Sequence, residues 1–154
     1  MIVYLVQHGE ATPKRVDPAR SLTERGRREV VRVAGVAARL GVEVQQIRHS
    51  GKARAQETAE ILGEALSPRD GVVAVPGLAP NDDVGAVAEA LGGEAGPLMF
   101  VGHLPFLARL AGLLVAGDAG RPVVQFRMGG IVCLAQADGL WQVAWILTPE
   151  MARV

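Results

Sequence analysis

The 154-residue sequence is poor in cysteine, and what is missing around its single cysteine is informative. One cysteine, Cys133, excludes an internal disulfide and any CxxC metal or redox site. The position six residues after it, 139, is glycine rather than arginine, so the loop of a cysteine-based phosphatase is also missing. We therefore expect Cys133 to be a packing residue in an apolar strand.

Long apolar runs and an excess of charge of either sign are missing as well. No stretch approaches about 18 uninterrupted apolar residues, and no basic region precedes the apolar N-terminus, so neither a membrane span nor a secretory signal is predicted. The 16 basic and 16 acidic residues cancel, which leaves no overall positive charge for nucleic acid or an anionic membrane. The expectation is a cytoplasmic protein with one domain over residues 1–154.

The apolar pattern that is present predicts alternating strands and helices. Ile2 to Val6 is typical of a strand buried on both faces, and spacing on one face predicts a helix over 24–40 between an N-cap at Thr23 and Gly41. The other expected elements are strands over 42–48, 71–75 and 98–101, helices over about 53–66, 84–91 and 105–116, and strands over 123–127, 131–135 and 141–147.

This order predicts a three-layer α/β/α fold with a mostly parallel sheet and an antiparallel, β-rich C-terminal part. Three of the expected parallel strands end at a histidine. The first leads into His8, and the strand before residue 103 leads into His103. The strand over 42–48 leads into His49 and Ser50, and Arg54 follows one helical turn later. Parallel strands bring such ends to one edge of the sheet, where ligands bind. Histidines, an arginine fork and helix N-termini together favour a bound anion such as phosphate.

A histidine in an anion site has two plausible roles, as a metal ligand or as a nucleophile that attacks phosphorus. A metal would prefer carboxylate or cysteine partners at ligand spacing, and the sequence has no HxxxH or HExxH pair. Phosphoryl transfer fits better, because its transition state spreads charge over three oxygens and needs well-placed positive donors. We expect a site with no metal and no cofactor.

Four motifs resemble the histidine phosphatase (phosphoglycerate mutase-like) superfamily. Gln7 to Glu10 resembles its Arg-His-Gly signature, and Leu22 to Gly26 resembles its LTxxG segment. Ser50 to Ala59 resembles its S-x-x-x-R-A-x-x-T-A stretch, and Gly102 to Pro105 resembles the GHxP form typical of small SixA-type phosphohistidine phosphatases. The motifs run in the family order from residue 7 to residue 105, which makes chance a poor explanation.

The resemblance implies a role for each matching residue. His8 is expected to accept the phosphoryl group, Arg54 to clamp it, and a cationic His103 to stabilise it in transit. The expected phosphate-binding residues are Gln7, Gly9, Ser50 and Lys52, with Ser50 acting mainly as a structural residue.

The sequence departs from the family pattern at two positions. Gln7 stands where the family has arginine, and Gly51 stands where it usually has proline. Lys52 either supplies the missing positive charge or is a solvated lysine at a helix start.

The choice of substrate depends on acid catalysis. Mutases and broad-specificity phosphatases of this superfamily protonate an alkoxide with a carboxylic acid, for which Asp82 or Asp83 is the candidate here. An imidazole leaves already protonated and needs less help, and a short chain leaves an open site suited to a protein side chain. We expect hydrolysis of phosphohistidine on a partner protein through phospho-His8. The alternatives are a small-molecule phosphomonoesterase and a weakly active phosphohistidine-binding regulator, in which Gln7 has lowered turnover.

Overall fold

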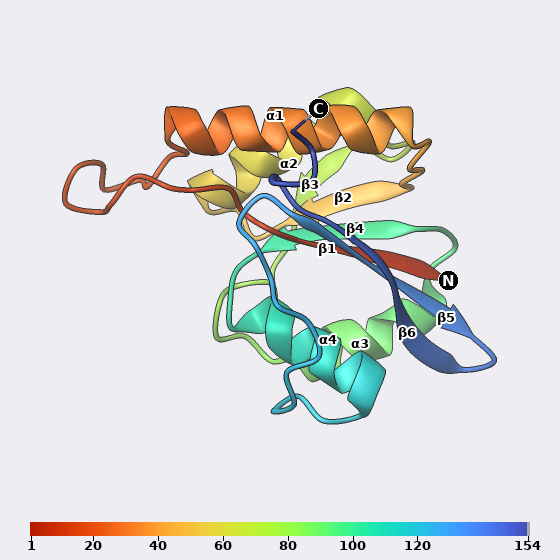
Figure 1. The fold of residues 1–154 in the computed structure, drawn as a ribbon. Helices are drawn as coiled ribbons and strands as arrows, with labels where there is room; N and C mark the ends of the chain where they lie inside the picture. Colours follow the sequence, from red (N-terminus) through yellow and green to blue (C-terminus); the bar gives the residue numbers. More distant parts are fainter. Residues whose placement is uncertain (154) are drawn as a thin grey trace.

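A computed structural model describes residues 1–153 and shows six strands and four α-helices within them (Figure 1). None of these helices is long and apolar enough to cross a membrane. In chain order the elements are β1 (Ile2–Gln7), α1 (Glu24–Arg39), β2 (Gln46–His49), α2 (Ala53–Leu66), β3 (Val72–Ala74), α3 (Val84–Ala90), the 3-10 turn η1 (Leu91–Gly93), β4 (Leu98–Gly102), α4 (Phe106–Ala116), β5 (Ile131–Ala137) and β6 (Leu140–Leu147).

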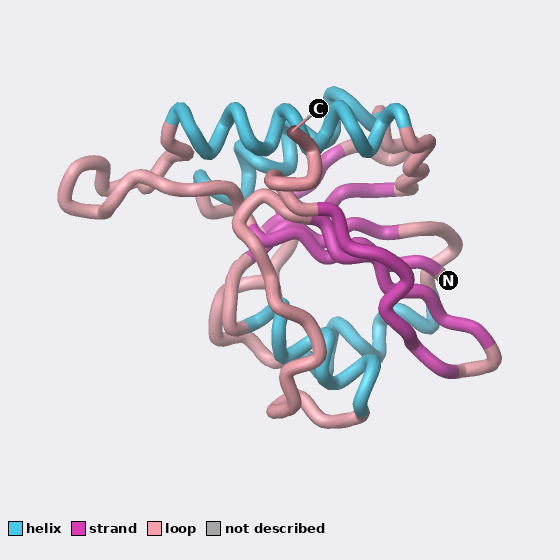
Figure 2. Tube along the Cα trace, in the orientation of Figure 1, coloured by secondary structure: helices cyan, strands magenta, loops and turns pink. Residues whose placement is uncertain are grey.

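The strands form one mixed sheet in the order β3-β2-β4-β1-β5-β6. β1 is parallel to β4, and β2 is parallel to both β3 and β4, whereas β5 and β6 are antiparallel to their neighbours. Helices α1 and α2 cover one face and α3 and α4 cover the other (Figure 2). The three-layer α/β/α prediction is confirmed, with the antiparallel part at the C-terminus as expected.

The central strand β1 is buried on both faces, as its apolar run predicts. Tyr4 and Val6 point into the core formed with α1 and α2, while Val3 and Leu5 point into the core formed with α3 and α4. Cys133 of β5 is 2% exposed and packs in the first of these cores, which confirms its packing role. The residues that follow β1 are therefore held by a rigid strand in the middle of the sheet.

One predicted local signal is confirmed, and a turn at the C-terminal hairpin shows a second. The Thr23 side chain accepts a hydrogen bond from the Gly26 amide and caps α1, and Gly41 ends that helix with a φ of 75°. The hairpin between β5 and β6 turns on Asp138 and Gly139, which have φ of 53° and 77°. Positive φ at both central residues is what a two-residue type I′ turn requires.

The predicted strand over 123–127 is wrong, and the strand predicted over 42–48 is shorter and begins at Gln46. Both positions beside β1 are occupied, by β4 and β5, so segment 123–127 does not join the sheet beside the central strand. It instead runs as a loop and buries Phe126 in the core on the α3 and α4 side. Apolar content alone did not distinguish this anchoring from strand pairing.

Candidate active site

The carboxyl ends of β1, β2 and β4 lie side by side, as the parallel pairing requires. Gln7 pairs with Gly102 and His49 pairs with Val101, so the three strands end at the same level of the sheet. The His8 amide also donates a hydrogen bond of 3.0 Å to the Gly102 carbonyl. The rings of His8 and His103 consequently face each other with centroids 5.2 Å apart.

His8 is held in one tautomer by its own backbone. Its Nδ1 lies 2.7 Å from the Gly9 carbonyl, an acceptor only, so Nδ1 carries the proton and Nε2 keeps its lone pair. Burial and then the positive charges of Arg54 and Arg20 lower the His8 pKa from its ordinary value, outweighing the opposite effect of the Gly9 hydrogen bond. His8 is thus a neutral imidazole with a nucleophilic Nε2 at neutral pH.

His103 is 2% exposed, and its Nε2 lies 2.6 Å from the Ser50 hydroxyl. Its Nδ1 is buried and has no hydrogen-bond partner among residues 1–153. Burial, followed by the charge of Arg54 and the proximity of His8, lowers the His103 pKa to about 3. His103 is therefore neutral in the ligand-free site at neutral pH, and its cationic role during phosphoryl transfer stays a prediction.

Arg54 lies in the first turn of α2 and is half-buried. Its Nε is buried without a hydrogen-bond partner within the described part of the chain. Burial and the neighbouring charge of Arg20 lower the pKa of the guanidinium. An unmatched cationic donor beside two histidines is an arrangement that a phosphate oxygen satisfies.

The sequence reasoning missed Arg20, whose charge lowers the pKa of His8, Arg54 and His103. It ends a loop over 11–20 that projects from the body of the molecule (Figure 1). Its backbone has a φ of 54°, rare for a residue with a side chain, and its Nε donates to the Thr12 carbonyl at 3.3 Å. A polar loop without periodicity carries no sequence signal for this placement.

Gly9, which was predicted to contact phosphate, is bound within the protein through its amide, and the phosphate contact stays a prediction. Its amide donates to the Thr58 hydroxyl at 3.0 Å, and that hydroxyl donates to the Arg54 carbonyl at 2.8 Å. A Cβ on Gly9 would lie 2.9 Å from a methyl group of Val30 in α1. The glycine therefore permits close packing, and Thr58 ties the His8 backbone to the helix that carries Arg54.

The two residues raised by the departures from the family pattern lie on different sides of the site. Gln7 is half-buried at the end of β1, where its carbonyl accepts the Gly129 amide at 2.9 Å. Lys52 is exposed at the N-terminus of α2, and its charge contributes to the low pKa of His103 but not to that of His8. Lys52 thus acts on one half of the site.

The candidate acids are both engaged in the loop that leads into α3. Asp82 accepts a hydrogen bond of 2.9 Å from the Ala79 amide, and Asp83 caps α3 by accepting 2.9 Å from the Gly85 amide. The geometry gives both carboxylates a local structural role. Neither contributes to the lowered pKa values of His8 and His103.

The third histidine, His49, is buried and supports the turn after β2, where its Nδ1 accepts the Gly51 amide at 3.0 Å. Within residues 1–153 no three side chains of the histidine, cysteine, aspartate or glutamate type are grouped to hold a metal ion.

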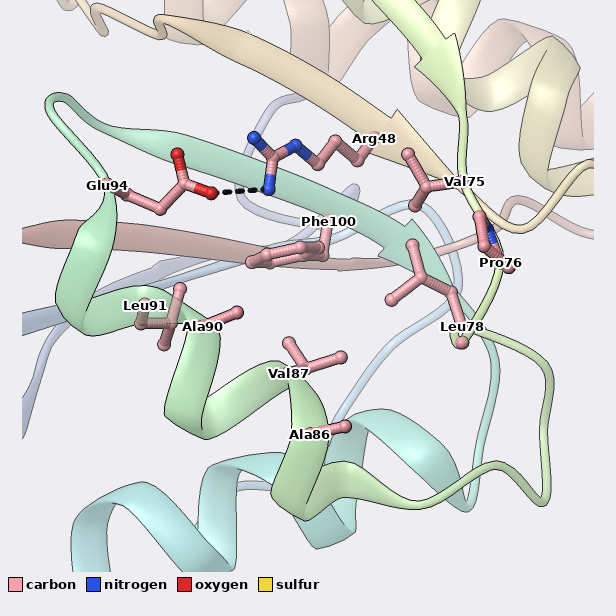
Figure 3. A pocket seen from close by; sticks show the side chains of 11 residues that line it. Arg48, Val75, Pro76, Leu78, Ala86, Val87, Ala90, Leu91, Glu94 and Phe100 are labelled. Carbon is pink, nitrogen blue, oxygen red and sulfur yellow. Dashed lines mark hydrogen bonds and ion pairs between the residues drawn. The ribbon is translucent and has the colours of Figure 1, made fainter.

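A cavity of about 240 Å³ lies between α3 and the loop that follows β3 (Figure 3). Its walls are mainly apolar, with Phe100 among them, and an ion pair of 2.8 Å between Arg48 and Glu94 lies at one end. None of the residues predicted for the phosphate site lines it. This cavity is distinct from the histidine edge.

Comparison with known proteins identifies the family that this fold and histidine pair define. The sequence model of the histidine phosphatase superfamily (branch 1) matches residues 3–79, and the chain belongs to that superfamily.

Two curated relatives and one solved structure match over most of their length. An uncharacterised protein from Picosynechococcus is 34% identical over 142 residues, which cover 87% of this chain and 84% of the relative. Phosphohistidine phosphatase SixA from Escherichia coli is 30% identical over 123 residues, covering 77% and 76%. A structure of the protein histidine phosphatase SixA complexed with tungstate superposes with a TM-score of 0.84 at 26% identity, covering 97% of both chains.

Proposed function

We propose that this protein hydrolyses phosphohistidine on a partner protein through a covalent phospho-His8 intermediate. The observation that carries the proposal is a neutral His8 whose Nε2 keeps its lone pair beside the positive charges of Arg54 and Arg20. The relative named phosphohistidine phosphatase supports this substrate class, and the related SixA structure with tungstate supports an oxyanion site.

The first step exchanges one phosphorus–nitrogen bond for another. His8 Nε2 attacks phosphorus and forms the new bond as the bond to the substrate imidazole breaks. That imidazole, protonated on its other nitrogen when bound, departs as a neutral ring. Arg54 and Arg20 stabilise the charge on the equatorial oxygens during transfer. The phosphoryl group also raises the pKa of His103, so that its ring becomes a cationic donor when the charge is present.

The second step returns the site to its starting state. Water attacks phosphorus, the bond to His8 Nε2 breaks, and both water protons leave with the phosphate as the dihydrogen ion. His8 keeps its Nδ1 proton throughout, because the Gly9 carbonyl at 2.7 Å holds it there. The backbone hydrogen bond therefore supplies the correct tautomer without a carboxylate partner.

The leaving group supports phosphohistidine over a phosphate ester. An alkoxide needs a general acid, and the two candidates for it, Asp82 and Asp83, each accept a hydrogen bond from a backbone amide of their own loop. An imidazole needs no such acid. One observation favours a second candidate, a phosphohistidine-binding regulator, because Gln7 offers one charge fewer than the family arginine.

The test is turnover of a protein carrying radiolabelled phosphohistidine, followed as loss of acid-labile phosphate. We expect wild type to release phosphate and His8→Asn to be inactive. An aryl phosphate serves as the comparison substrate. Faster turnover of the aryl phosphate would support the phosphomonoesterase alternative, and binding of the phosphoprotein without turnover would support the regulator.

A further inference from the structure

The outer face of α1 carries a cluster of arginines that the phosphoryl chemistry does not use. Arg25, Arg28 and Arg32 recur at helical spacing, and with Glu29 and Arg153 they line a surface cavity of about 200 Å³. Four guanidinium groups thus surround one carboxylate in a chain whose formal net charge is zero. The charge of the protein is therefore distributed unevenly, with a strongly positive face on α1.

The internal partners of this arginine face are weak. Arg25 lies 3.8 Å from Glu29 and Arg28 lies 4.0 Å from Glu24, and both arginine side chains are about two-thirds exposed, at 66% and 67%. Exposed pairs of this kind contribute little to stability and leave most of the positive potential in place. Arg32 Nε is buried without a hydrogen-bond partner among residues 1–153. Glu24 and Glu29 thus neutralise only part of the charge of the four arginines.

The first two turns of α1 pack directly against the residues that follow the nucleophile. A Cβ on Gly26 would lie 2.3 Å from the Glu10 carbonyl, and Val30 contacts Gly9. The acids in this region are held by their own neighbours, since Glu57 pairs with Arg27 at 2.6 Å and Glu10 accepts the Thr23 hydroxyl at 2.8 Å. The helix that carries the arginine face is thus packed directly against the residues that follow His8.

We propose that the arginine face of α1 docks an acidic surface of the phosphohistidine-carrying protein, an inference that rests on the proposed function. The helix rises about 1.5 Å per residue, so the arginines from Arg25 to Arg32 extend over about 10 Å. A small phosphorylated molecule bound at His8 could not contact arginines spread over that length. A folded protein can present a phosphohistidine to His8 and carboxylates to this face together. Such charge complementarity speeds association and selects among carriers.

The experiment compares two histidine-phosphorylated carrier domains, one with an acidic surface around its phosphohistidine and one with a basic surface. A small phosphoramidate serves as a third substrate that reports the site alone. In Arg25→Glu/Arg28→Glu we expect kcat/KM for the acidic carrier at low salt to fall about tenfold or more, with the small substrate unchanged. The wild-type rate on the acidic carrier should fall as salt is added, and the rate of this variant should not.

A matched control reverses two exposed arginines elsewhere. Arg69→Glu/Arg121→Glu changes the net charge equally but leaves α1 intact, and we expect it to keep the acidic-carrier rate. An equal fall in this control, or an unchanged rate in the α1 variant, overturns the docking inference alone. If neither carrier is hydrolysed while the phosphoramidate is, the docking inference and the proposed function both fail. Retained phosphoramidate turnover shows that each variant is folded.

Discussion

Arg20 offers the sharpest mutational test of the site, because its charge acts on the site although no sequence motif predicts it there. Its charge acts on His8, Arg54 and His103, whereas Lys52 acts on His103 but not on His8. We therefore propose that Arg20 supplies the charge that the family places at position 7. The informative changes are Arg20→Gln, Gln7→Arg and the two combined.

The magnitude follows from one charge-assisted hydrogen bond to a phosphoryl oxygen. Such a bond contributes about 1.5 to 3 kcal/mol, so its loss from the transition state lowers the rate roughly 10- to 150-fold. We expect Arg20→Gln to lose a factor in that range and Lys52→Ala to lose less. Gln7→Arg should rescue Arg20→Gln more than it speeds wild type, since the two positions then serve one phosphate.

The assay is kcat/KM for a small phosphoramidate, which avoids any effect on protein docking. Arg15→Gln is the matched control, because Arg15 is exposed in the same projecting loop and should change the rate by less than about twofold. If Arg20→Gln behaves like Arg15→Gln, Arg20 is a structural residue of the loop. The charge missing at position 7 then has no replacement at position 20.

Three further outcomes are expected. Chelators should leave turnover unchanged. If EDTA abolished turnover and a divalent ion restored it, the alternative role of the histidines as metal ligands would be favoured. Tungstate binding should take up a proton, measured by calorimetry in buffers of different ionisation enthalpy, because the anion raises the His103 pKa from about 3, and binding without uptake would mean that His103 stays neutral. Gly26→Ala should lose about 1 to 3 kcal/mol in urea unfolding, since its Cβ overlaps the Glu10 carbonyl, whereas Gly35→Ala on the open side of α1 should lose nothing.

The His103 pKa also predicts how stability changes with pH. The folded protein holds this ring neutral down to about pH 3, whereas the unfolded chain protonates it near its ordinary value of 6.5. The unfolded state therefore binds more protons between these values. This contribution to stability is fully present above pH 6.5 and is lost as the pH falls toward 3.

The sequence predicted the parallel part of the fold well, because buried strands and amphipathic helices leave distinct periodic patterns. β1 and α1 are examples, with a β-branched run in one and the Thr23 cap in the other. Segment 123–127 has the composition of a strand, but it runs as a loop and anchors Phe126 in the core. Whether an apolar segment pairs as a strand or only anchors a side chain depends on tertiary packing, which composition alone does not specify.

The part of the site that lies at strand ends and in sequence motifs could be predicted from the sequence. The part that depends on the burial of a side chain or on the path of a loop could not. His8 and His103 meet because β1 and β4 are parallel neighbours. The neutral state of His103 depends on its burial, which family resemblance does not specify. The position of Arg20 depends on the path of a loop that has no periodic sequence pattern. The hydrogen bond of the Gly9 amide is made to Thr58, which lies 49 residues away in the sequence.

Trapping the phosphoenzyme tests the central claim most directly. The protein is mixed with a radiolabelled phosphohistidine protein, quenched within one turnover, digested under alkaline conditions and mapped by mass spectrometry. We expect an acid-labile, base-stable phosphate on His8 in wild type and none in His8→Ala, which should also lack turnover. Full turnover by His8→Ala, or a label on a different residue, would contradict the covalent phospho-His8 mechanism.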